Sequence, residues 1–429
     1  SICVSWVSLA IAFINNRGYE NAMSIDDAFA AIEEASSGGE HPNIWCKEAG
    51  FDGLCAAKGL RAFLVTRQNG RMEQPVGGNE GRDRVGLWCD YFRALRSLDF
   101  DISINGEVKR LSDFATKYID GLGWKGHAYS LGGIDLRRLD FVPIHDLAAF
   151  IVLRLTNHKS DAMGIELSAM GEIGPRYMWH GTDAEVNGSE DIEGSTTRIF
   201  DCGHYHVATH FGSKGFGCDG GRFRAGIFSR ILPGEGREIA FAALADLDED
   251  ALVKRVVSGT NDYVSEFRLL AQHYREYMLS MPTINTTHSP LNRAIDSAKG
   301  ASIELFSESP VVKGWFAGIP CFSWFFTGDG SLISRAANGL GLCTMTEEHL
   351  GTMASFRSGR GQIPHELVQI PEVNSRGIKT GYMHISATPL WMIALHDTYM
   401  WTGNASLISR HYPGVKAALG FLSSLDRDG

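Results

Sequence analysis

The spacing of apolar residues changes near residue 245, and this change limits the folds that the chain can adopt. Before it, short runs alternate apolar with polar residues, as in residues 98–104, which lead into Asn105-Gly106. Such runs are typical of antiparallel strands joined by tight turns. Beyond residue 245, apolar residues recur with the three- and four-residue spacing of helices. The sequence therefore predicts an α+β multidomain chain in which an antiparallel β-sandwich precedes a helical part.

The change of spacing divides the chain into four expected segments. Residues 1–58 are partly helical and match no pattern of known function. Residues 59–245 are expected to form the β-sandwich domain, residues 246–287 a helical linker, and residues 288–429 a helical domain. The clearest strands are expected at 60–66, 98–104, 148–156, 163–169, 223–232 and 237–244. The helices of the last segment are expected at 291–306, 331–341, 346–357, 388–401 and 405–425.

Charge and cysteine content narrow the class of partner and the compartment. The formal net charge is −10 and the 40 Lys and Arg residues form no basic patch, which argues against a nucleic acid or an anionic membrane as partner. Residues 2–13 are apolar but too few to span a bilayer. The eight cysteines lack Cys-x-x-Cys spacing, which favours reduced thiols and a cytoplasmic location. The sequence does not indicate an oligomeric state.

Residues 314–334 combine two Trp, four Phe and four Gly with a single carboxylate, Asp329. Aromatic rings can stack on the apolar face of a sugar, and a carboxylate can accept hydrogen bonds from its hydroxyls. We expect Asp329 in a loop just before a helix that begins at Ser331. The alternative is a buried aromatic cluster in which Asp329 is an ordinary helix N-cap.

Three further motifs follow this aromatic stretch. They are Gln-Ile-Pro-His-Glu at 362–366, Thr-Pro-Leu-Trp at 388–391 and Trp-Thr-Gly-Asn at 401–404. In this order, they resemble the C-terminal catalytic domain of the glycogen-debranching (amylo-α-1,6-glucosidase) and glucoamylase-like glycosidases. The resemblance covers roughly residues 288–429. It implies a six-hairpin (α/α)6 barrel, of which the sequence would supply an incomplete, first part.

The resemblance implies hydrolysis of α-glucosidic linkages in a glycogen-like, starch-like or oligosaccharide substrate. Such enzymes invert the anomeric centre with two carboxyl groups about 6.5–9.5 Å apart, and the resemblance implies no metal or organic cofactor. The family carries its acid and base beyond an Asp-x-Asp-Gly loop, which residues 426–429 resemble. We therefore expect the general acid and base to lie outside these 429 residues, leave the catalytic residues unknown, and expect these residues alone to be inactive.

The sequence departs from the family pattern at two polar positions. Gly328 stands where the family has Arg before the Asp, and Ser386 stands where it has Asp before Thr-Pro-Leu-Trp. A glycine at position 328 is expected either to leave a roomier sugar site or to serve a turn with positive φ. Because these departures remove polar sugar contacts, the alternative function is a non-catalytic carbohydrate-binding relative.

Seven residues are expected to bind substrate on the strength of their types and of the resemblance. They are Trp315, Phe316, Trp324, Asp329, His365, Glu366 and His384. For His365 and Glu366 three roles stay open: substrate contact, structural hydrogen bonding, and direct acid or base catalysis.

A histidine-rich run in the expected sandwich suggests a third hypothesis. His204, His206 and His210 share the parity of one strand face, and Cys202 stands close to them. Such residues can hold zinc, but this spacing is no established zinc signature, and polar strand faces are common. We expect no metal here and keep a metal-bearing structural or interaction module only as a hypothesis.

Overall fold

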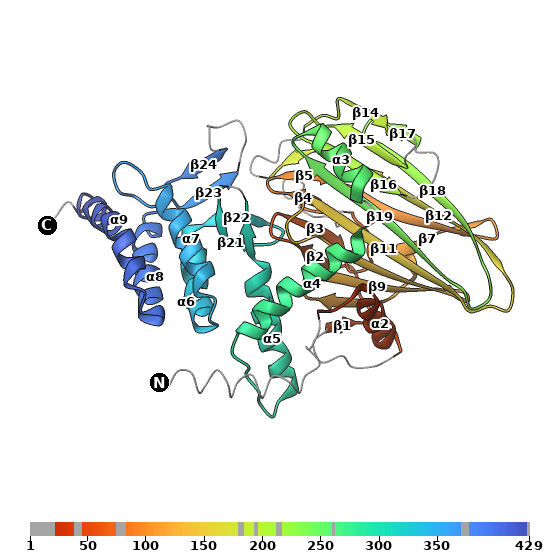
Figure 1. Ribbon diagram of the computed structural model, residues 1–429, viewed down its shortest axis with the longest axis horizontal. Helices are drawn as coiled ribbons and strands as arrows, with labels where there is room; N and C mark the ends of the chain where they lie inside the picture. The colour runs from red at the N-terminus through yellow and green to blue at the C-terminus, as the bar shows by residue number, and fades with distance from the viewer. Residues whose placement is uncertain are drawn as a thin grey trace.

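The computed structural model describes residues 22–37, 45–73, 83–178, 184–192, 196–211, 217–259, 262–309, 311–369 and 377–426. Within these ranges the predicted mixed α+β class is confirmed, because antiparallel sheets dominate up to residue 246 and most helices follow (Figure 1). Residues 2–13 and the end of the Asp-x-Asp-Gly loop lie outside the described ranges. In the part that is described, no helix is long and apolar enough to cross a membrane.

A nine-stranded antiparallel sheet forms the centre of the β-rich part (Figure 1). Its strands, in spatial order, are β1 (Trp45–Lys47), β8 (Ala115–Gly121), β9 (Trp124–Leu131), β10 (Ile134–Phe141), β11 (Ala148–Asn157), β19 (Gly236–Asp246), β16 (His206–Phe211), β15 (Thr197–Asp201) and β14 (Gly188–Asp191).

Two smaller antiparallel sheets belong to the same part. The first has the order β17 (Gly217–Asp219), β18 (Arg222–Ile231), β12 (Met163–Glu172), β6 (Ser97–Ile104) and β7 (Glu107–Arg110). The second has the order β13 (Arg176–Tyr177), β5 (Phe92–Leu95), β4 (Gly86–Cys89), β3 (Ala62–Arg67) and β2 (Leu54–Lys58). The hairpin predicted at Asn105-Gly106 is confirmed: it joins β6 to β7, and both residues have the positive φ of a type I′ turn.

The smaller sheets pack on one face of the nine-stranded sheet. Phe100 of β6 contacts Phe211 and Phe241, with ring centroids 6.0 and 6.3 Å away. The other face is covered by helices α2 (Ile25–Ser36), α3 (Glu249–Gly259) and α4 (Tyr263–Ser280), which share a second apolar core with it (Figure 1). The central strands β9 and β11 are buried along nearly their whole length, as expected for a sheet that is covered on both faces.

The helical part combines helices with a small sheet. The five helices expected there are found, with ends that differ by a few residues: α5 (Ser289–Glu304), α6 (Thr327–Gly339), α7 (Cys343–Ser355), α8 (Ala387–Thr402) and α9 (Ala405–Ser423). The sheet was not predicted, and its order is β20 (Phe306–Glu308), β21 (Lys313–Gly318), β22 (Phe322–Phe326), β23 (Glu366–Gln369) and β24 (Ile378–Gly381). The aromatic stretch thus folds mainly as the β21–β22 hairpin and the start of α6.

Lys58 lies at the joint between the two parts. Its buried ammonium group donates to the carbonyl oxygens of Gly59 and Phe306, each at 2.8 Å, while its own carbonyl accepts from the Tyr274 hydroxyl at 2.8 Å. Burial lowers the pKa of the Lys58 amine to about 7. Phe63 and Phe316 continue the contact, with ring centroids 6.4 Å apart. The small sheet is therefore packed against the β-rich part.

Candidate functional site

Three rings lie along one face of strand β22. Successive strand side chains point to opposite faces, so Phe322, Trp324 and Phe326 share a face while Ser323 and Phe325 turn into the protein. The centroids of neighbouring rings are 5.8 Å apart for Phe322 and Trp324, and 5.3 Å apart for Trp324 and Phe326. Phe322 is 45% exposed and Phe326 only 8% exposed, so this row runs from solvent toward the interior.

Two histidines extend these rings into what we call the ring row (Phe322, Trp324, Phe326, His365 and His384). The centroid of His365 is 5.3 Å from that of Phe326 and 4.3 Å from that of His384. The backbone fixes His365 between strands, because its N–H donates to the Gly381 carbonyl at 2.6 Å and its carbonyl accepts from the Thr327 N–H at 2.9 Å. The structure therefore brings the predicted residues Trp324, His365 and His384 together.

Glu366 lies buried behind the ring row. The Trp324 indole Nε1 donates to Glu366 Oε2 at 3.0 Å, so this carboxylate fixes the orientation of the indole. Gly381 faces Glu366 across β23 and β24, and a Cβ atom added there would lie 2.8 Å from Glu366 Oε1. Glycine at position 381 therefore leaves the space that the Glu366 carboxylate occupies.

Asp329 lies in the first turn of α6, not in a preceding loop. The helix begins at Thr327 rather than Ser331, and its N-cap is Phe326, so both the loop prediction and the N-cap alternative are wrong. The Asp329 side chain is exposed, and within the described ranges no hydrogen bond or ion pair engages its carboxylate. The positive end of the helix dipole favours a carboxylate at this position. Asp329 is thus held near the ring row with its oxygens free for a ligand.

Gly328 also lies inside the first turn of α6, and its φ is not positive. The turn-forming role considered for it is therefore wrong. A Cβ atom at this position would meet only Leu390 Cδ1, at an ordinary 3.8 Å. The backbone and the surrounding space would both accept a side chain here.

The charged groups around His365 set its protonation. Burial lowers the pKa of His365 below its ordinary value, and the neighbouring His384 lowers that pKa further. The carboxylates of Glu366 and Asp329 act in the opposite direction without overcoming these effects. The His365 imidazole is therefore neutral near pH 7 and can both donate and accept a hydrogen bond.

Trp315 and Phe316 differ from their expected role. Trp315 is fully buried, and its Nε1 donates to the Ser302 carbonyl at 2.9 Å. Phe316 is buried between Phe63 and Phe325. Both side chains belong to the core in this structure and present no surface to a sugar, so we leave them out of the proposed site. Phe322 and Phe326 were not among the expected residues, although their two-residue spacing from Trp324 is visible in the sequence.

The histidine-rich run does not gather around a common point. The His206 imidazole faces Glu249, with Nδ1 3.6 Å from a carboxylate oxygen, and His210 Nδ1 lies 3.0 Å from the Thr197 hydroxyl. Cys202 is buried, with its thiol turned toward the Phe200 carbonyl. Among the residues that the structure describes, no three His, Cys, Asp or Glu side chains come together as metal ligands.

The chain matches no protein-family model, and no curated protein matches its sequence. Among solved structures, its fold is similar to that of a putative kojibiose phosphorylase from the human microbiome, with a TM-score of 0.58 and 8% identity over 86% of this chain and 57% of that one. It is also similar to a bacterial glucoamylase solved with acarbose, with a TM-score of 0.52 and 9% identity over 88% of this chain and 67% of that one. The chain thus spans little more than half the length of the first of these proteins. At such low identities, the likeness establishes a shared fold.

Proposed function

We propose that the chain belongs to a carbohydrate-active enzyme of the six-hairpin glycosidase type that hydrolyses α-glucosidic linkages in glycogen-like, starch-like or oligosaccharide substrates. The observation that carries this proposal is the ring row beside two carboxylates, with Trp324 fixed by Glu366 at 3.0 Å. The order of the sequence motifs and the fold shared with a glucoamylase and a kojibiose phosphorylase support it.

A sugar ring would lie on the exposed faces of the ring row. Trp324 offers an aromatic face whose orientation is already fixed, which lowers the entropy lost on binding. Asp329 would accept hydrogen bonds from sugar hydroxyls, and the neutral His365 would donate one or accept one. We therefore retain Trp324, Asp329, His365, Glu366 and His384 as the proposed substrate site, with Glu366 acting through Trp324.

We propose an inverting mechanism in which one carboxyl group protonates the leaving oxygen and a second activates water. Glu366 is a poor candidate for either role, because it is buried and accepts a hydrogen bond from Trp324. Asp329 is proposed as a binding group at the innermost sugar. The general acid and base therefore remain unassigned.

The charges near His365 favour a neutral sugar over a phosphate ion at the ring row. The groups that shift its pKa are His384, Glu366 and Asp329, and they include no Lys or Arg. A phosphate ion is bound best by guanidinium or ammonium groups, and two carboxylates would repel it. A neutral sugar meets no such penalty.

We propose that residues 59–245, together with strands β1 and β2 of the N-terminal segment 1–58, form a β-sandwich domain, because β1 pairs with β8 and β2 pairs with β3. Residues 246–287 would form a helical linker, and residues 288–429 the first part of an (α/α)6 barrel. The packing of α6 with α7 and α8, and of α8 with α9, supports the last assignment. The described cysteines are free thiols, which supports a cytoplasmic location.

The test compares products formed by the full-length natural protein and by its Trp324→Ala variant. The proposal predicts glucose release from maltotriose or glycogen without added phosphate, and a loss of this activity in the variant. Phe228→Ala, which removes an exposed ring of strand β18, is the matched control. Glucose 1-phosphate formed only with phosphate would replace hydrolysis by phosphorolysis. Trp324-dependent binding without any product would favour the non-catalytic carbohydrate-binding relative.

A further inference from the structure

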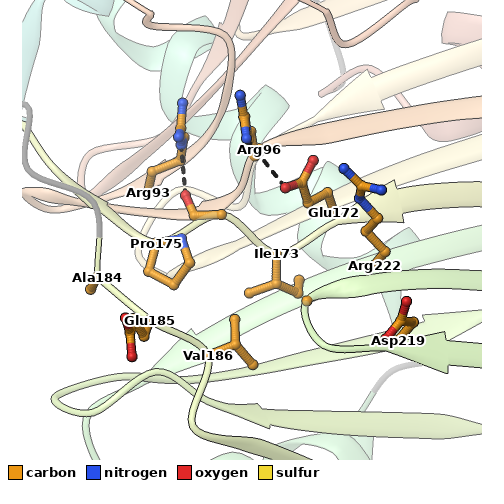
Figure 2. A pocket seen from close by; sticks show the side chains of 12 residues that line it. Arg93, Arg96, Glu172, Ile173, Pro175, Ala184, Glu185, Val186, Asp219 and Arg222 are labelled. Carbon is orange, nitrogen blue, oxygen red and sulfur yellow. Dashed lines mark hydrogen bonds and ion pairs between the residues drawn. The ribbon is translucent and has the colours of Figure 1, made fainter.

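Two hollows lie on the surface of the β-rich part, and their lining residues do not belong to the ring row. One cavity of about 500 Å³ is lined by Arg93, Arg96, Glu172, Pro175, Val186 and Arg222, among others (Figure 2). A second hollow of about 610 Å³ shares Glu172, Asp219 and Arg222 with it. The two hollows therefore adjoin each other, and we refer to them together as the groove.

The groove follows one face of the sheet β17-β18-β12. In the strand register, Arg222 lies opposite Glu172 of β12 and opposite Asp219 of β17. Arg224 likewise lies opposite Met170 and Gly217, so these positions share one face of the sheet. The groove then turns past Pro175 toward Arg93 and Arg96, which Figure 2 shows on the opposite side of the cavity from Glu185 and Val186. This shape suits an extended ligand rather than a compact ion.

The formal charges around the first cavity balance. Three guanidinium groups (Arg93, Arg96 and Arg222) face three carboxylates (Glu172, Glu185 and Asp219). Two of the cations are already engaged, because Arg93 Nη1 lies 2.8 Å from Asp83 and Arg96 Nη1 lies 3.2 Å from Glu172. Within this cavity, an ion of either sign therefore gains little net attraction; Arg224 adds one positive charge to the adjoining hollow.

Free donors and acceptors remain along the groove. Arg222, Asp219 and Glu185 have no hydrogen bond or ion pair with any residue that the structure describes. A neutral polyol can donate to such carboxylates and accept from such a guanidinium. Half-buried Met170 and Val186 add apolar surface that the C–H groups of a sugar ring can contact.

We propose that this groove is a second saccharide-binding site that takes a short stretch of a neutral glucan chain. The choice of a saccharide among neutral polyols rests on the proposed function, whereas the groove itself uses none of the ring-row residues. The protein would then hold one glucan chain at two separate places.

The test is a calorimetric titration of maltoheptaose into the Trp324→Ala protein, in which the ring row is disabled. Binding should persist in this background and should weaken at least about tenfold when Arg222→Ala is added, because a charged hydrogen-bond donor is lost. Arg230→Ala, an exposed arginine on the same strand, is the matched control and should leave the affinity unchanged.

A second variant blocks the groove from a position that tolerates a side chain. A Cβ atom at Gly217 would meet no described residue within 4 Å, so Gly217→Leu should fold and should also weaken the binding. Hydrogen exchange should slow in residues 217–224 when maltoheptaose is added to the Trp324→Ala protein.

Three results would overturn this inference. They are loss of all maltoheptaose binding in the Trp324→Ala protein, binding that is indifferent to Arg222→Ala, and occupation of the groove by inorganic phosphate or glucuronate instead of maltoheptaose. Loss of all maltoheptaose binding in the Trp324→Ala protein would leave the proposed function intact. Groove binding that survives while the ring row fails to bind sugar would contradict the proposed function and leave this inference standing.

Discussion

Trp324 combines an aromatic face with a hydrogen-bond donor that is already used. Its ring lies between Phe322 and Phe326, while its Nε1 donates to Glu366 at 3.0 Å. The indole therefore keeps one orientation before any ligand arrives, and the backbone of Gly381 leaves the space that the Glu366 carboxylate needs. At the scale of single residues, the site therefore depends on Glu366 and Gly381, which lie behind the ring row, as much as on the rings.

Asp329→Asn should lower kcat/KM of the full-length enzyme by more than about tenfold, because a hydrogen bond from a sugar hydroxyl to a carboxylate contributes about 1.5–3 kcal/mol. Asp262→Asn is the matched control, since Asp262 is an exposed carboxylate before α4 that makes no capping bond. Steady-state kinetics on maltotriose measure both variants. Unchanged kinetics for Asp329→Asn in a folded protein would remove Asp329 from the site.

Gly381→Ala should weaken sugar binding without direct contact to the sugar. The added Cβ would lie 2.8 Å from Glu366 Oε1, so the carboxylate must move and release the Trp324 indole. We expect a rise in the dissociation constant for maltotriose of about tenfold, the effect of one lost hydrogen bond to a charged group. Gly318→Ala is the control, because a Cβ at Gly318 would lie more than 4 Å from every neighbouring side chain in the described part of the chain. Equal affinities for the two variants would show that Glu366 does not position Trp324.

Parts of the site could be predicted from residue types and motif order, and parts could not. The sequence pointed to Trp324, Asp329, His365 and Glu366 because polar or aromatic residues stand there in a recognisable order. It could not separate Trp324 from the core residue Trp315, because both occur in one aromatic run. The separation depends on strand pairing, which places Trp315 against α5 and Trp324 on the open face of β22.

Helix α7 packs on strand β21 and on helix α6 through an imidazole and two glycines, Gly314 of β21 and Gly330 of α6. His349 of α7 is fully buried, and Cβ atoms at Gly314 and Gly330 would lie 2.4 and 2.0 Å from its ring nitrogens. This contact explains the glycine at position 330, in the run Thr327-Gly-Asp-Gly330 that has the composition of a turn and yet forms the first turn of α6. The sequence could not predict this helix start, because the reason for Gly330 lies on another helix.

Gly330→Ala should destabilise the protein, whereas Gly328→Ala should not. Alanine at 330 forces a methyl group into His349, and overpacking of this kind costs about 1–3 kcal/mol. Alanine at 328 meets only Leu390 at 3.8 Å and should stabilise the helix by up to about 1 kcal/mol. Chemical denaturation of both variants measures the free energy of unfolding. A stable Gly330→Ala protein would contradict the close packing of α6 on His349.

The whole molecule is tied together by contacts between distant segments. The Lys58 amine donates to the carbonyl of Phe306, 248 positions away, and Tyr274 donates to the carbonyl of Lys58. Periodicity predicted most of the helices and six of the strands, but it carries no information about which sheet packs on which. The small sheet β20–β24 was missed for the same reason, since short apolar strands in a helical region lack a clear period.

Acid should destabilise the protein, because the folded state keeps two buried histidines neutral. Burial lowers the pKa of His349 to about 3 and that of His273 to about 4. Below a pH of about 6.5 the unfolded chain binds a proton at each position and the folded chain does not, so unfolding becomes more favourable as the pH falls. Above that pH both states are neutral at these positions, and the effect disappears.

The fully buried His349 alone should lower the free energy of unfolding by up to about 1.4 kcal/mol per pH unit between its ordinary and its lowered pKa. Denaturant titrations at about pH 7 and about pH 5, which lie above and below the ordinary histidine pKa, measure this slope. His349→Gln should reduce the slope because glutamine does not titrate. An identical slope in this variant would show that folding does not lower the pKa of His349.

The most direct measurement of the central claim is an experimental structure of the protein with bound maltotriose. The account predicts a sugar ring stacked on Trp324, with a hydroxyl at hydrogen-bond distance, about 2.5–3.0 Å, from the Asp329 carboxylate. Maltotriose bound elsewhere, with Trp324 and Asp329 untouched, would contradict it.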